Sequence, residues 1–532
     1  MKRFKEGLLS GKDFVATCEL VPGRGHTGMG IDNIMKFAEE AKDSKYIYGL
    51  SLTDNAGGNP ALCADILGPE IQSLGPDLLV HFSCKDMNRN MIEARAYALK
   101  RAGVTNLLVI TGDYPISGAF GLPKPVFDID AVIALHYLRQ MNEGLEVESG
   151  RKTIKLDPTD FFLGAVTSPF KATEASAYMQ YYKMEKKIRA GAHFIATQLG
   201  YDSRKFAEFY KYVRQILGLN IPLIGSVYVL SAGAARFMAG GEVPGCYVSD
   251  RLVGVLQEEA KAEDKGKSDR LTRAAKQVAI LKGLGYNGAH IEGLNLKFAD
   301  VTTIMERSEE IGENWRDHLE ELDFSPKNNF FMFEGGEDLS FAKNGGEPKF
   351  RVTRRKRIAS PKFWMMRLAH KLFFIEGTLG YKLMRGFAKS AQRRRLRYKV
   401  LQALEHVAKR ALFDCRECDD CALFEMYYLC PESRCPKGQR IGPCGGARIN
   451  GNCEVFDDRP CIWELVYWRA KSRKELDNLQ YVINPRNWKL YETSSWVNYF
   501  LKQDHSGNHV GVPKAIPNGN LQKILDKPGN VL

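Results

Sequence analysis

The chain has 532 residues, a length that corresponds to two or three domains of ordinary size. Hydrophobic residues make up 44% and charged residues 26%, which excludes a wholly disordered, collagen-like or purely coiled-coil protein. The sequence holds no stretch of about 18 uncharged apolar residues, so we expect no membrane span. Its basic first residues lack the apolar core of a secretory signal, and we therefore expect a cytoplasmic protein.

The positive charge is concentrated in one segment. The formal net charge is +13, but residues 351–410 hold 18 Lys/Arg and only 2 Asp/Glu, a local net of +16. We expect a helical segment with one packed face and one solvated basic face. Runs at 354–357 and 393–395 can attract nucleic acid, but no groove-reading motif accompanies them. Docking of an acidic redox partner and association of residues 363–374 with a membrane surface are further alternatives.

Eight apolar, β-rich runs alternate with helical patterns over about the first 300 residues. Most runs are almost continuously apolar, which is typical of strands buried on both faces. The pattern predicts a (β/α)8 barrel. An open doubly wound sheet is the less favoured alternative, because no G-x-G-x-x-G motif follows a predicted strand. The predicted strands are residues 14–20, 46–53, 78–84, 106–112, 161–167, 193–199, 221–229 and 288–294; helical patterns include 29–42, 89–103 and 177–191.

The sequence suggests four regions. We expect the barrel at residues 1–310 and a linker with the basic helical segment at 311–410. A Cys-rich module follows at 411–470, and a C-terminal tail occupies 471–532. No internal repeat is evident in the sequence.

Polar side chains end five of the predicted strands. In barrels of this type the chemistry lies at the carboxyl ends of the strands, so these side chains are candidates for a functional site. A hydrogen-bonded structural role is the alternative for each of them. The candidates are Glu19, Thr53, His81, Cys84, Asp86, Asp113 and Gln198.

Several of these residues lie in motifs that resemble one enzyme family. The segments CELVP, SLT, HFSCKD, TGDYP and RAGAHFIATQLGYD follow one another in the order found in the methylenetetrahydrofolate reductase family. Residues 242–253 also resemble a late barrel motif of that family, so the resemblance covers about residues 12–300. It implies a flavin-bearing barrel, with FAD or FMN, that reduces methylenetetrahydrofolate to methyltetrahydrofolate in one-carbon and methionine metabolism.

The resemblance also implies roles for single residues. Glu19 matches a general acid that protonates the leaving nitrogen when the folate's five-membered ring opens. Asp113 matches an aspartate that stabilises the resulting cation and tunes the flavin, and Gln198 matches an amide that binds the pterin. NAD(P)H would share the folate's place on the flavin. Matches to flavin-contact positions are Thr53, His81, Thr111, Gly112, Asp113 and Lys187, the last suited to a flavin phosphate.

Two positions depart from the family pattern. Thr111 stands where the family often has arginine, which removes one phosphate contact. Residues 226–237 lack an obvious match to the aromatic side chain that stacks on folate in some members. A one-carbon-pathway scaffold or electron-transfer protein with altered barrel activity is therefore the alternative function.

Eight of the 12 cysteines lie within a short C-terminal stretch. In a reducing compartment such a cluster is more typical of a metal site than of disulfides. Eight thiolates form two sets of four, which suits [4Fe–4S] clusters or zinc. The triple C-x2-C-x2-C and two Cys-Pro pairs favour iron–sulfur. The proposed ligands are Cys415, Cys418, Cys421, Cys430, Cys435, Cys444, Cys453 and Cys461.

This module resembles the C-terminal family of methylenetetrahydrofolate reductases, through GPCGG at 442–446 and the segment at 453–463. The resemblance implies an accessory electron-transfer module fused to the reductase barrel. Clusters near a flavin would allow an acidic redox partner such as ferredoxin to replace or supplement NAD(P)H. We also expect a homo-oligomer and no specific nucleic-acid partner.

Overall fold

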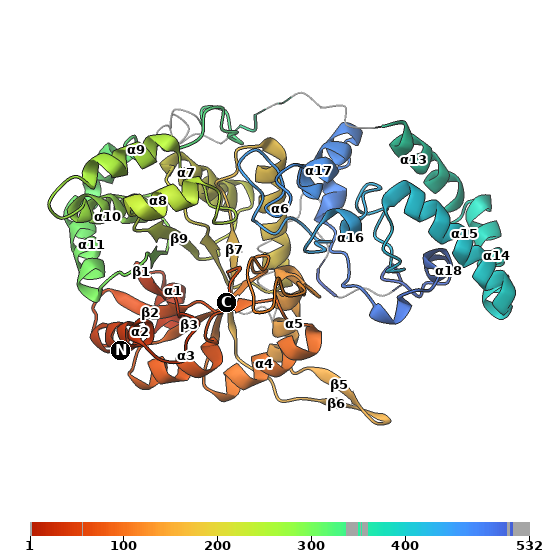
Figure 1. Cartoon of the computed structure of the whole chain (residues 1–532), viewed down its shortest axis with the longest axis horizontal. Coiled ribbons are helices and arrows are strands. Elements are labelled where there is room, and N and C mark those ends of the chain that lie inside the picture. Colours follow the sequence, from red (N-terminus) through yellow and green to blue (C-terminus); the bar gives the residue numbers. More distant parts are fainter. Residues whose placement is uncertain are drawn as a thin grey trace.

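The computed structural model describes residues 3–55, 57–336, 349–351, 353, 360–507 and 511–513. A barrel forms one side of the molecule, and the helices that follow it in the sequence form the other side (Figure 1). The basic run at 354–357 and most of the linker stretch at 333–350 lie outside the described residues. Among the described helices, none is long and apolar enough to cross a membrane.

Eight parallel strands close into a barrel in the order β1-β10-β9-β8-β7-β4-β3-β2. This confirms the predicted (β/α)8 fold, and each of the eight barrel strands falls within a predicted run. An antiparallel hairpin, β5–β6, is inserted before β7 and stands apart from the barrel (Figure 1). The strands are β1 (Val15–Leu20), β2 (Ile47–Leu52), β3 (Leu78–Ser83), β4 (Asn106–Ile110), β5 (Glu146–Ser149), β6 (Lys152–Lys155), β7 (Phe162–Thr167), β8 (Phe194–Thr197), β9 (Leu223–Tyr228) and β10 (Gly288–Glu292).

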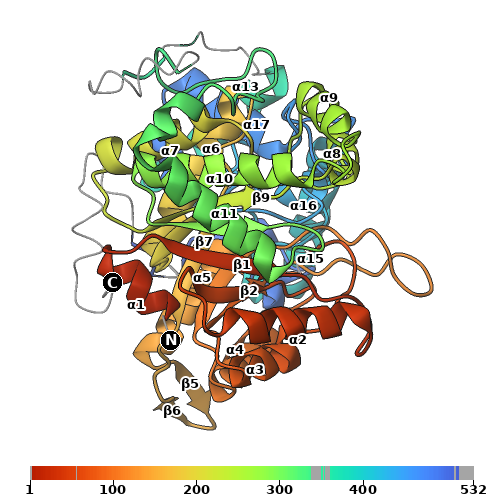
Figure 2. The same ribbon diagram turned by 90° about the vertical axis from the view of Figure 1, so that its left-hand side faces the viewer.

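Helices cover the outside of the barrel, and α10 and α11 form one wall of it (Figure 2). Helix α11 continues to Ile311, so the helical alternation persists beyond residue 300, where the sequence pattern weakens. The helices of this part are α1 (Phe4–Ser10), α2 (Met29–Ala41), α3 (Ala64–Ser73), α4 (Arg89–Arg101), α5 (Ala131–Glu143), α6 (Glu174–Ala190), α7 (Ser203–Lys211), α8 (Ala232–Ala239), α9 (Asp250–Glu259), α10 (Lys267–Leu284) and α11 (Phe298–Ile311).

One end of the barrel is filled by apolar side chains. Phe4 of α1 is fully buried, and its ring lies 6.0 Å from that of Phe162 and 5.3 Å from that of Phe194. Both partners stand at the amino ends of their strands, β7 and β8. The carboxyl ends of the strands are therefore left to carry polar side chains.

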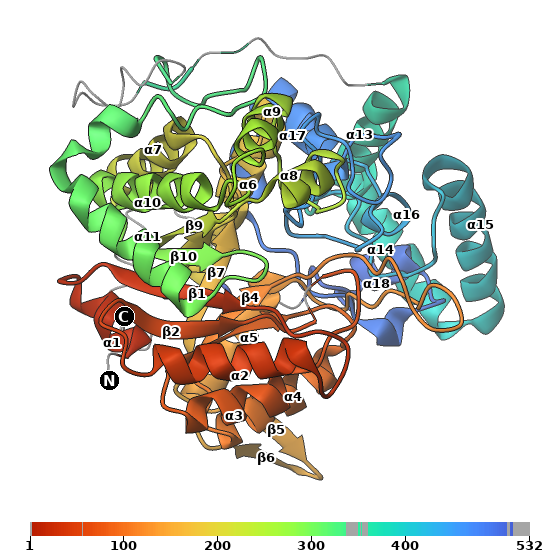
Figure 3. The same ribbon diagram turned by 60° about the vertical axis from the view of Figure 1, so that its left-hand side comes forward.

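The C-terminal half consists of helices and of loops that carry the cysteines. The basic helices lie at the edge farthest from the barrel (Figures 1 and 3). Residues of the predicted tail belong to this half, because Val497 and Phe500 are buried against Tyr381 and Leu401. The helices are α13 (Pro361–Phe373), α14 (Leu379–Arg393), α15 (Arg395–Phe413), α16 (Pro431–Arg434), α17 (Ile462–Arg473) and α18 (Ser495–Phe500).

Buried lysines of the barrel hold the cysteine module in place. Lys171 Nζ donates to the carbonyl oxygens of Gly445 and Ala447 at 2.5 and 2.8 Å. Lys186 Nζ donates to the carbonyl oxygen of Ile441 at 2.6 Å. Both lysines are almost completely buried, so these backbone acceptors replace the water that the ammonium groups lose. The module and the barrel therefore share a desolvated polar interface.

A glutamate of the module also caps a barrel helix. Glu464 of α17 accepts hydrogen bonds from the backbone nitrogen and the hydroxyl of Ser176, at 3.1 and 2.7 Å, and from the hydroxyl of Thr173. Thr173 is the N-cap residue of α6. The carboxylate therefore lies at the positive end of the helix dipole, where a negative charge is stabilising.

We expect Glu464→Ala to lower the free energy of unfolding by about 1–3 kcal/mol, because it leaves buried donors without an acceptor. Urea unfolding of the purified protein measures this change. Asp458→Ala is the matched control, because Asp458 is an exposed acid of the same module. Equal effects of the two substitutions would contradict the capping role.

Candidate functional site

Two carboxyl groups on neighbouring strands lie at the mouth of the barrel. The register pairs Cys18 of β1 with Ile291 of β10, so Glu19 and Glu292 follow at the same level. Burial raises the pKa of Glu19 to about 7. Burial and the charge of Glu19 raise the pKa of Glu292 well above its usual value. The pair therefore retains at least one proton near neutral pH.

Two neutral histidines stand beside Glu19. One nitrogen of His81, one of His290 and a carboxylate oxygen of Glu19 lie within 4.8 Å of one another. Burial lowers the pKa of His81 to about 4 and that of His290 to about 3. The hydroxyl of Ser51 lies 2.6 Å from His81 Nε2, and that of Thr17 lies 2.8 Å from His290 Nδ1. These uncharged rings do not hold Glu19 in its ionised form.

The sequence interpretation missed Glu292 and His290. Both lie in the strand run at 288–294, where they alternate with Ala289 and Ile291. That alternation was the available signal, because every second side chain of a barrel strand faces inward. Their meeting with Glu19 depends on barrel closure between the first and last strands.

Asp113 follows β4 and is brought next to the cysteine module. Burial raises the pKa of Asp113 to about 6, while Lys437 opposes this shift and Glu454 adds to it. Lys437 Nζ donates to the carbonyl oxygen of Gly112 at 2.8 Å and forms an ion pair with Glu454. Gly112 has φ 86°, and a Cβ there would lie 2.5 Å from Ser83 Oγ, so this turn requires glycine.

The charges of acids from different strands act on one thiol. Burial raises the pKa of Cys246, the charges of Glu292, Asp113 and Glu19 raise it further, and the charge of Lys171 lowers it. Cys246 lies in the segment between α8 and α9.

The other predicted site residues occupy separate positions. Thr111 is buried after β4, and the half-buried Thr53 donates through its backbone nitrogen to the carbonyl oxygen of Leu20 at 3.1 Å. The side-chain oxygen of Gln198 accepts from the backbone nitrogen of Leu199 at 2.9 Å. The structure therefore brings Glu19 and His81 together, whereas Thr53 and Gln198 make local hydrogen bonds.

Lys187 on α6 points its ammonium group into the barrel wall. Its Nζ donates to the carbonyl oxygen of Val166 at 2.5 Å, and burial lowers its pKa to about 7. In the described part of the chain, the buried hydroxyls of Thr167 and Ser168 have no hydrogen-bond partner. Unsatisfied buried hydroxyls beside a buried lysine suit an anionic or polar ligand at the end of β7.

A large cavity opens between the barrel and the module. Its volume is about 840 Å³, and its walls include the start of α4, the segment leading into α5 and residues 436–441. Basic and aromatic side chains line it, among them Lys124, Tyr137 and Trp488. This lining suits a ligand that combines negative charge with an aromatic ring.

The eight cysteines separate into two sets in sequence order. Each set lines its own small cavity, and α16 lies between them. Among the described residues, the one group of three metal-type ligand atoms within 4.8 Å is the Glu–His group of the barrel, so no three cysteine sulfurs approach this closely. Four thiolates on one zinc would lie about 3.8 Å apart, given Zn–S bonds of about 2.3 Å. The cysteine sulfurs of each set are therefore farther apart than a single zinc ion would hold them. The first set is Cys415, Cys418, Cys421 and Cys430; the second is Cys435, Cys444, Cys453 and Cys461.

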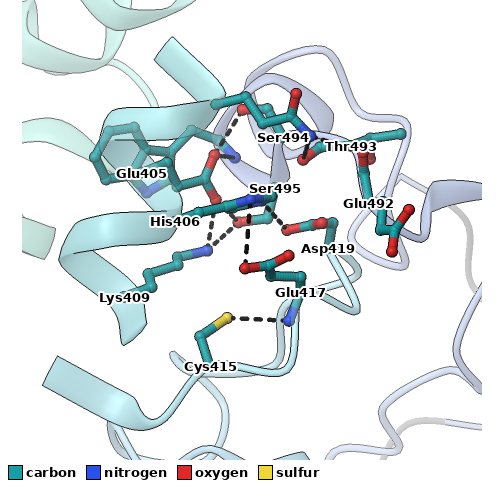
Figure 4. Close-up of polar contacts among 12 residues, drawn as sticks. Glu405, His406, Lys409, Cys415, Glu417, Asp419, Glu492, Thr493, Ser494 and Ser495 are labelled. Carbon is teal, nitrogen blue, oxygen red and sulfur yellow. Dashed lines mark hydrogen bonds and ion pairs between the residues drawn. The ribbon is translucent and has the colours of Figure 1, made fainter. Parts of the chain in front are cut away.

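A polar network surrounds the first set. Lys409 of α15 forms an ion pair with Glu405 at 2.7 Å and donates to the hydroxyl of Ser495 (Figure 4). His406 lies 3.3 Å from Asp419, in the loop that carries the first three cysteines (Figure 4). The basic helix α15 is thus joined directly to the first cysteine set.

Comparison with known proteins assigns the family. Residues 5–309 match the family model described as methylenetetrahydrofolate reductase. The chain belongs to the methylenetetrahydrofolate reductase family. Residues 397–489 match a second model, described as methylene-tetrahydrofolate reductase C terminal. Both matches confirm the resemblance that the sequence motifs indicated.

Individual relatives are distant. Methylenetetrahydrofolate reductase 2 of Saccharomyces cerevisiae is 25% identical over 301 residues, covering 53% of this chain and 45% of the relative. Methylenetetrahydrofolate reductase (NADH) 1 of Arabidopsis thaliana is 25% identical over 218 residues, covering 38% and 33%. The chain thus spans less than half the length of these curated relatives. A solved protein from Clostridium thermocellum, described as binding two copies of 5-methyl-5,6,7,8-tetrahydrofolic acid, is 15% identical with a TM-score of 0.37, over 58% of this chain and 98% of that one.

The division of the cysteines leads to a prediction about metal content. If each set holds one of the [4Fe–4S] clusters expected from the sequence, Cys418→Ser and Cys453→Ser should each lose about half of the bound iron and acid-labile sulfide, because each removes one thiolate of a different set. Iron, zinc and sulfide are quantified on protein purified without oxygen. Cys63→Ser is the control, because Cys63 is exposed and lies outside both sets. Zinc without sulfide would contradict the cluster assignment.

Proposed function

We propose that the protein reduces 5,10-methylenetetrahydrofolate to 5-methyltetrahydrofolate with a flavin bound at the barrel mouth. The observation that carries this proposal is the half-buried carboxyl of Glu19 at the barrel mouth, whose pKa of about 7 suits proton donation near neutral pH. The neutral histidines beside it supply no positive charge that would keep it ionised. Family membership supports the same reaction.

FAD is the flavin that the site supports best. The unsatisfied hydroxyls of Thr167 and Ser168, together with Lys187, suit a polar or phosphate group. The cavity of about 840 Å³ has the basic and aromatic lining that an adenosine diphosphate tail requires. When bound, the flavin supplies hydride to the carbon of the folate.

Three residues of the chain are proposed to act on the folate during the reaction. Glu19 in its protonated form donates a proton to the leaving nitrogen as the ring of the folate opens. Asp113 in its ionised form stabilises the positive charge that ring opening creates. Gln198 is proposed to bind the pterin through its side-chain amide, after giving up its local hydrogen bond to Leu199.

The cysteine module is proposed to deliver electrons to the barrel. Cys444 lies 3.7 Å from Glu454, which is paired with Lys437. Lys437 in turn donates to the carbonyl oxygen of Gly112, beside Asp113. This short chain of contacts supports a route between the second cysteine set and the barrel mouth. NAD(P)H bound in the folate's place is the alternative donor.

We expect Glu19→Gln to lower folate reduction about 100- to 10,000-fold, because an amide cannot act as the acid, while flavin content stays unchanged. Anaerobic single-turnover assays measure the rate, and the visible spectrum measures the flavin. Glu292→Gln, on the neighbouring strand, is the matched control. We expect it to lower the rate of folate reduction less than Glu19→Gln does. An equal loss in both variants would contradict the assignment of the acid to Glu19.

The pH dependence of the reaction follows from the two carboxyl groups. Glu19 must be protonated, so activity is expected to fall as the pH rises above about 7. Asp113 must be ionised, so activity is expected to fall as the pH drops below about 6. A narrow bell-shaped profile of kcat/KM results, and Asp113→Asn should remove its acidic limb while lowering the rate. A flat wild-type profile between pH 5 and 8, about one unit to either side of these values, would contradict both roles.

The alternative is an electron-transfer protein or scaffold of one-carbon metabolism with an altered barrel. The absence of an obvious folate-stacking aromatic in residues 226–237 favours it. It predicts normal metal content but no turnover of methylenetetrahydrofolate with any donor. Anaerobic titration of the flavin-loaded protein with the folate separates the two functions.

A further inference from the structure

An apolar cavity of about 340 Å³ lies beside the first cysteine set, well away from the barrel mouth. Helices α13, α14 and α15 form its walls together with the segment at 421–428 and the start of α18. Its lining is dominated by aromatic and aliphatic side chains, which suits a flat apolar ligand. The side chains that bear on the argument are Met366, Phe373, Leu412, Phe424, Trp496 and Tyr499.

A histidine and a tyrosine that line this cavity supply a hydrogen-bond donor to it. The hydroxyl of Tyr428 lies 2.9 Å from His370 Nδ1, and burial lowers the pKa of His370, so the ring is neutral. Whichever of the two groups donates across this contact, the pair keeps one further N–H or O–H for a ligand. The ring of His370 is fixed by stacking on Phe424, with centroids 3.8 Å apart. A carbonyl oxygen is the acceptor that such a donor binds.

The cavity touches a candidate metal ligand. Cys421 belongs to the first cysteine set and lines the cavity directly, next to Lys409. The ammonium group of Lys409 is neutralised by Glu405. Asp504 also lines the cavity, where its carboxylate accepts hydrogen bonds from the backbone nitrogen and the hydroxyl of Ser506. An apolar ligand here would lie beside Cys421 of the first set.

The helices that enclose the cavity carry exposed apolar stripes on their outer faces. On α14 the stripe consists of Leu379, Leu383 and Phe387, which recur every four residues. On α15 the stripe extends from Leu396 to Val407, about 17 Å at 1.5 Å per residue. It lies opposite the buried face of that helix, so the described part of the chain leaves it uncovered. Such stripes mark a surface that associates with another apolar phase.

The positive charge around these stripes indicates which kind of partner can cover them. Residues 360–413 hold 13 Lys/Arg and 2 Asp/Glu, a net charge of +11. A second copy of the chain would present the same positive charge to itself, which opposes self-association through this face. An anionic bilayer matches both the apolar stripes and the basic side chains, and its fluidity accommodates stripes on separate helices.

We propose that the cavity binds a quinone-type electron carrier drawn from an anionic bilayer that contacts the exposed stripes of α14 and α15. This inference builds on the proposed cluster at the first cysteine set. A hydroquinone loses two O–H hydrogens as two protons and two electrons, and becomes a quinone. The protons would pass to solvent, and a cluster held by Cys415, Cys418, Cys421 and Cys430 would accept the two electrons one at a time. Reduction of methylenetetrahydrofolate takes up two electrons and two protons. Oxidation of one hydroquinone releases the same numbers, so the two half-reactions balance in either direction.

Binding of the carrier is tested with menadione, a quinone ring without a lipid tail, on the anaerobic full-length protein. We expect saturable quenching of tryptophan fluorescence that is lost in Trp496→Phe. Ala408→Phe fills the cavity and should weaken binding at least about tenfold. Ala403→Phe is the matched control, because Ala403 is exposed on the same helix.

Two results would overturn the quinone assignment. One is equal binding of menadione by the wild-type protein and Ala408→Phe. The other is equally tight binding of naphthalene, which lacks carbonyl groups and would reveal a general apolar cavity. These titrations contain no folate. A failure of folate reduction with menadione binding intact would therefore contradict the proposed function and leave the cavity assignment standing.

The membrane surface is tested by flotation with phosphatidylcholine vesicles, with and without phosphatidylglycerol. We expect flotation only with the anionic lipid, and its loss in Leu404→Glu. Ile66→Glu is the control, because Ile66 and Leu404 are both 63% exposed and Ile66 lies on the barrel. Absence of flotation would overturn the bilayer assignment. If the protein instead binds an acidic protein through Leu404, the surface would be a protein-docking site.

Discussion

The contact on which the arrangement depends is made by one buried lysine. Lys437 comes from the cysteine module, is 3% exposed, and donates to the carbonyl oxygen of Gly112 at the end of β4. Its charge is balanced by Glu454, which lies beside Cys444. Because an unpaired buried ammonium group is strongly destabilising, these partners fix the module against the carboxyl end of β4. The position of Asp113 relative to the cysteines follows from this contact.

The same physical rule organises the rest of the interface. The lysines of the barrel that face the module are desolvated, and Lys171, Lys183 and Lys186 each donate to a backbone carbonyl of the module. Each donor requires the module to follow one particular backbone path. A desolvated polar interface of this kind gives a unique orientation, whereas an apolar one of equal area would tolerate sliding. Electron transfer between fixed centres benefits from such an orientation.

The sequence predicted the barrel well because nearly continuous apolar runs report strands buried on both faces. It placed Glu19 and His81 among the candidate site residues because both lie in motifs that follow the family order, and the structure brings the two side chains close together. It missed Glu292, whose meeting with Glu19 requires contact between the first and last strands of a closed barrel. It also missed Lys437, which lies 325 residues from its acceptor Gly112. Contacts at such separation leave no periodic pattern in the chain, so hydrophobic spacing could not reveal them.

The basic segment was the hardest part to interpret because charge alone fits several partners. In the structure, the buried faces of α14 and α15 pack on α18, while apolar side chains also remain on the outside. Purely solvated basic helices would not keep a stripe from Leu396 to Val407 in contact with water, since each such side chain favours burial by about 1–3 kcal/mol. The stripe lies on the helix that also carries Lys409, beside the first cysteine set. The exposed stripe and the contacts to the first cysteine set therefore lie on a single helix, so the proposed electron route would begin at the edge of the molecule farthest from the barrel (Figure 1).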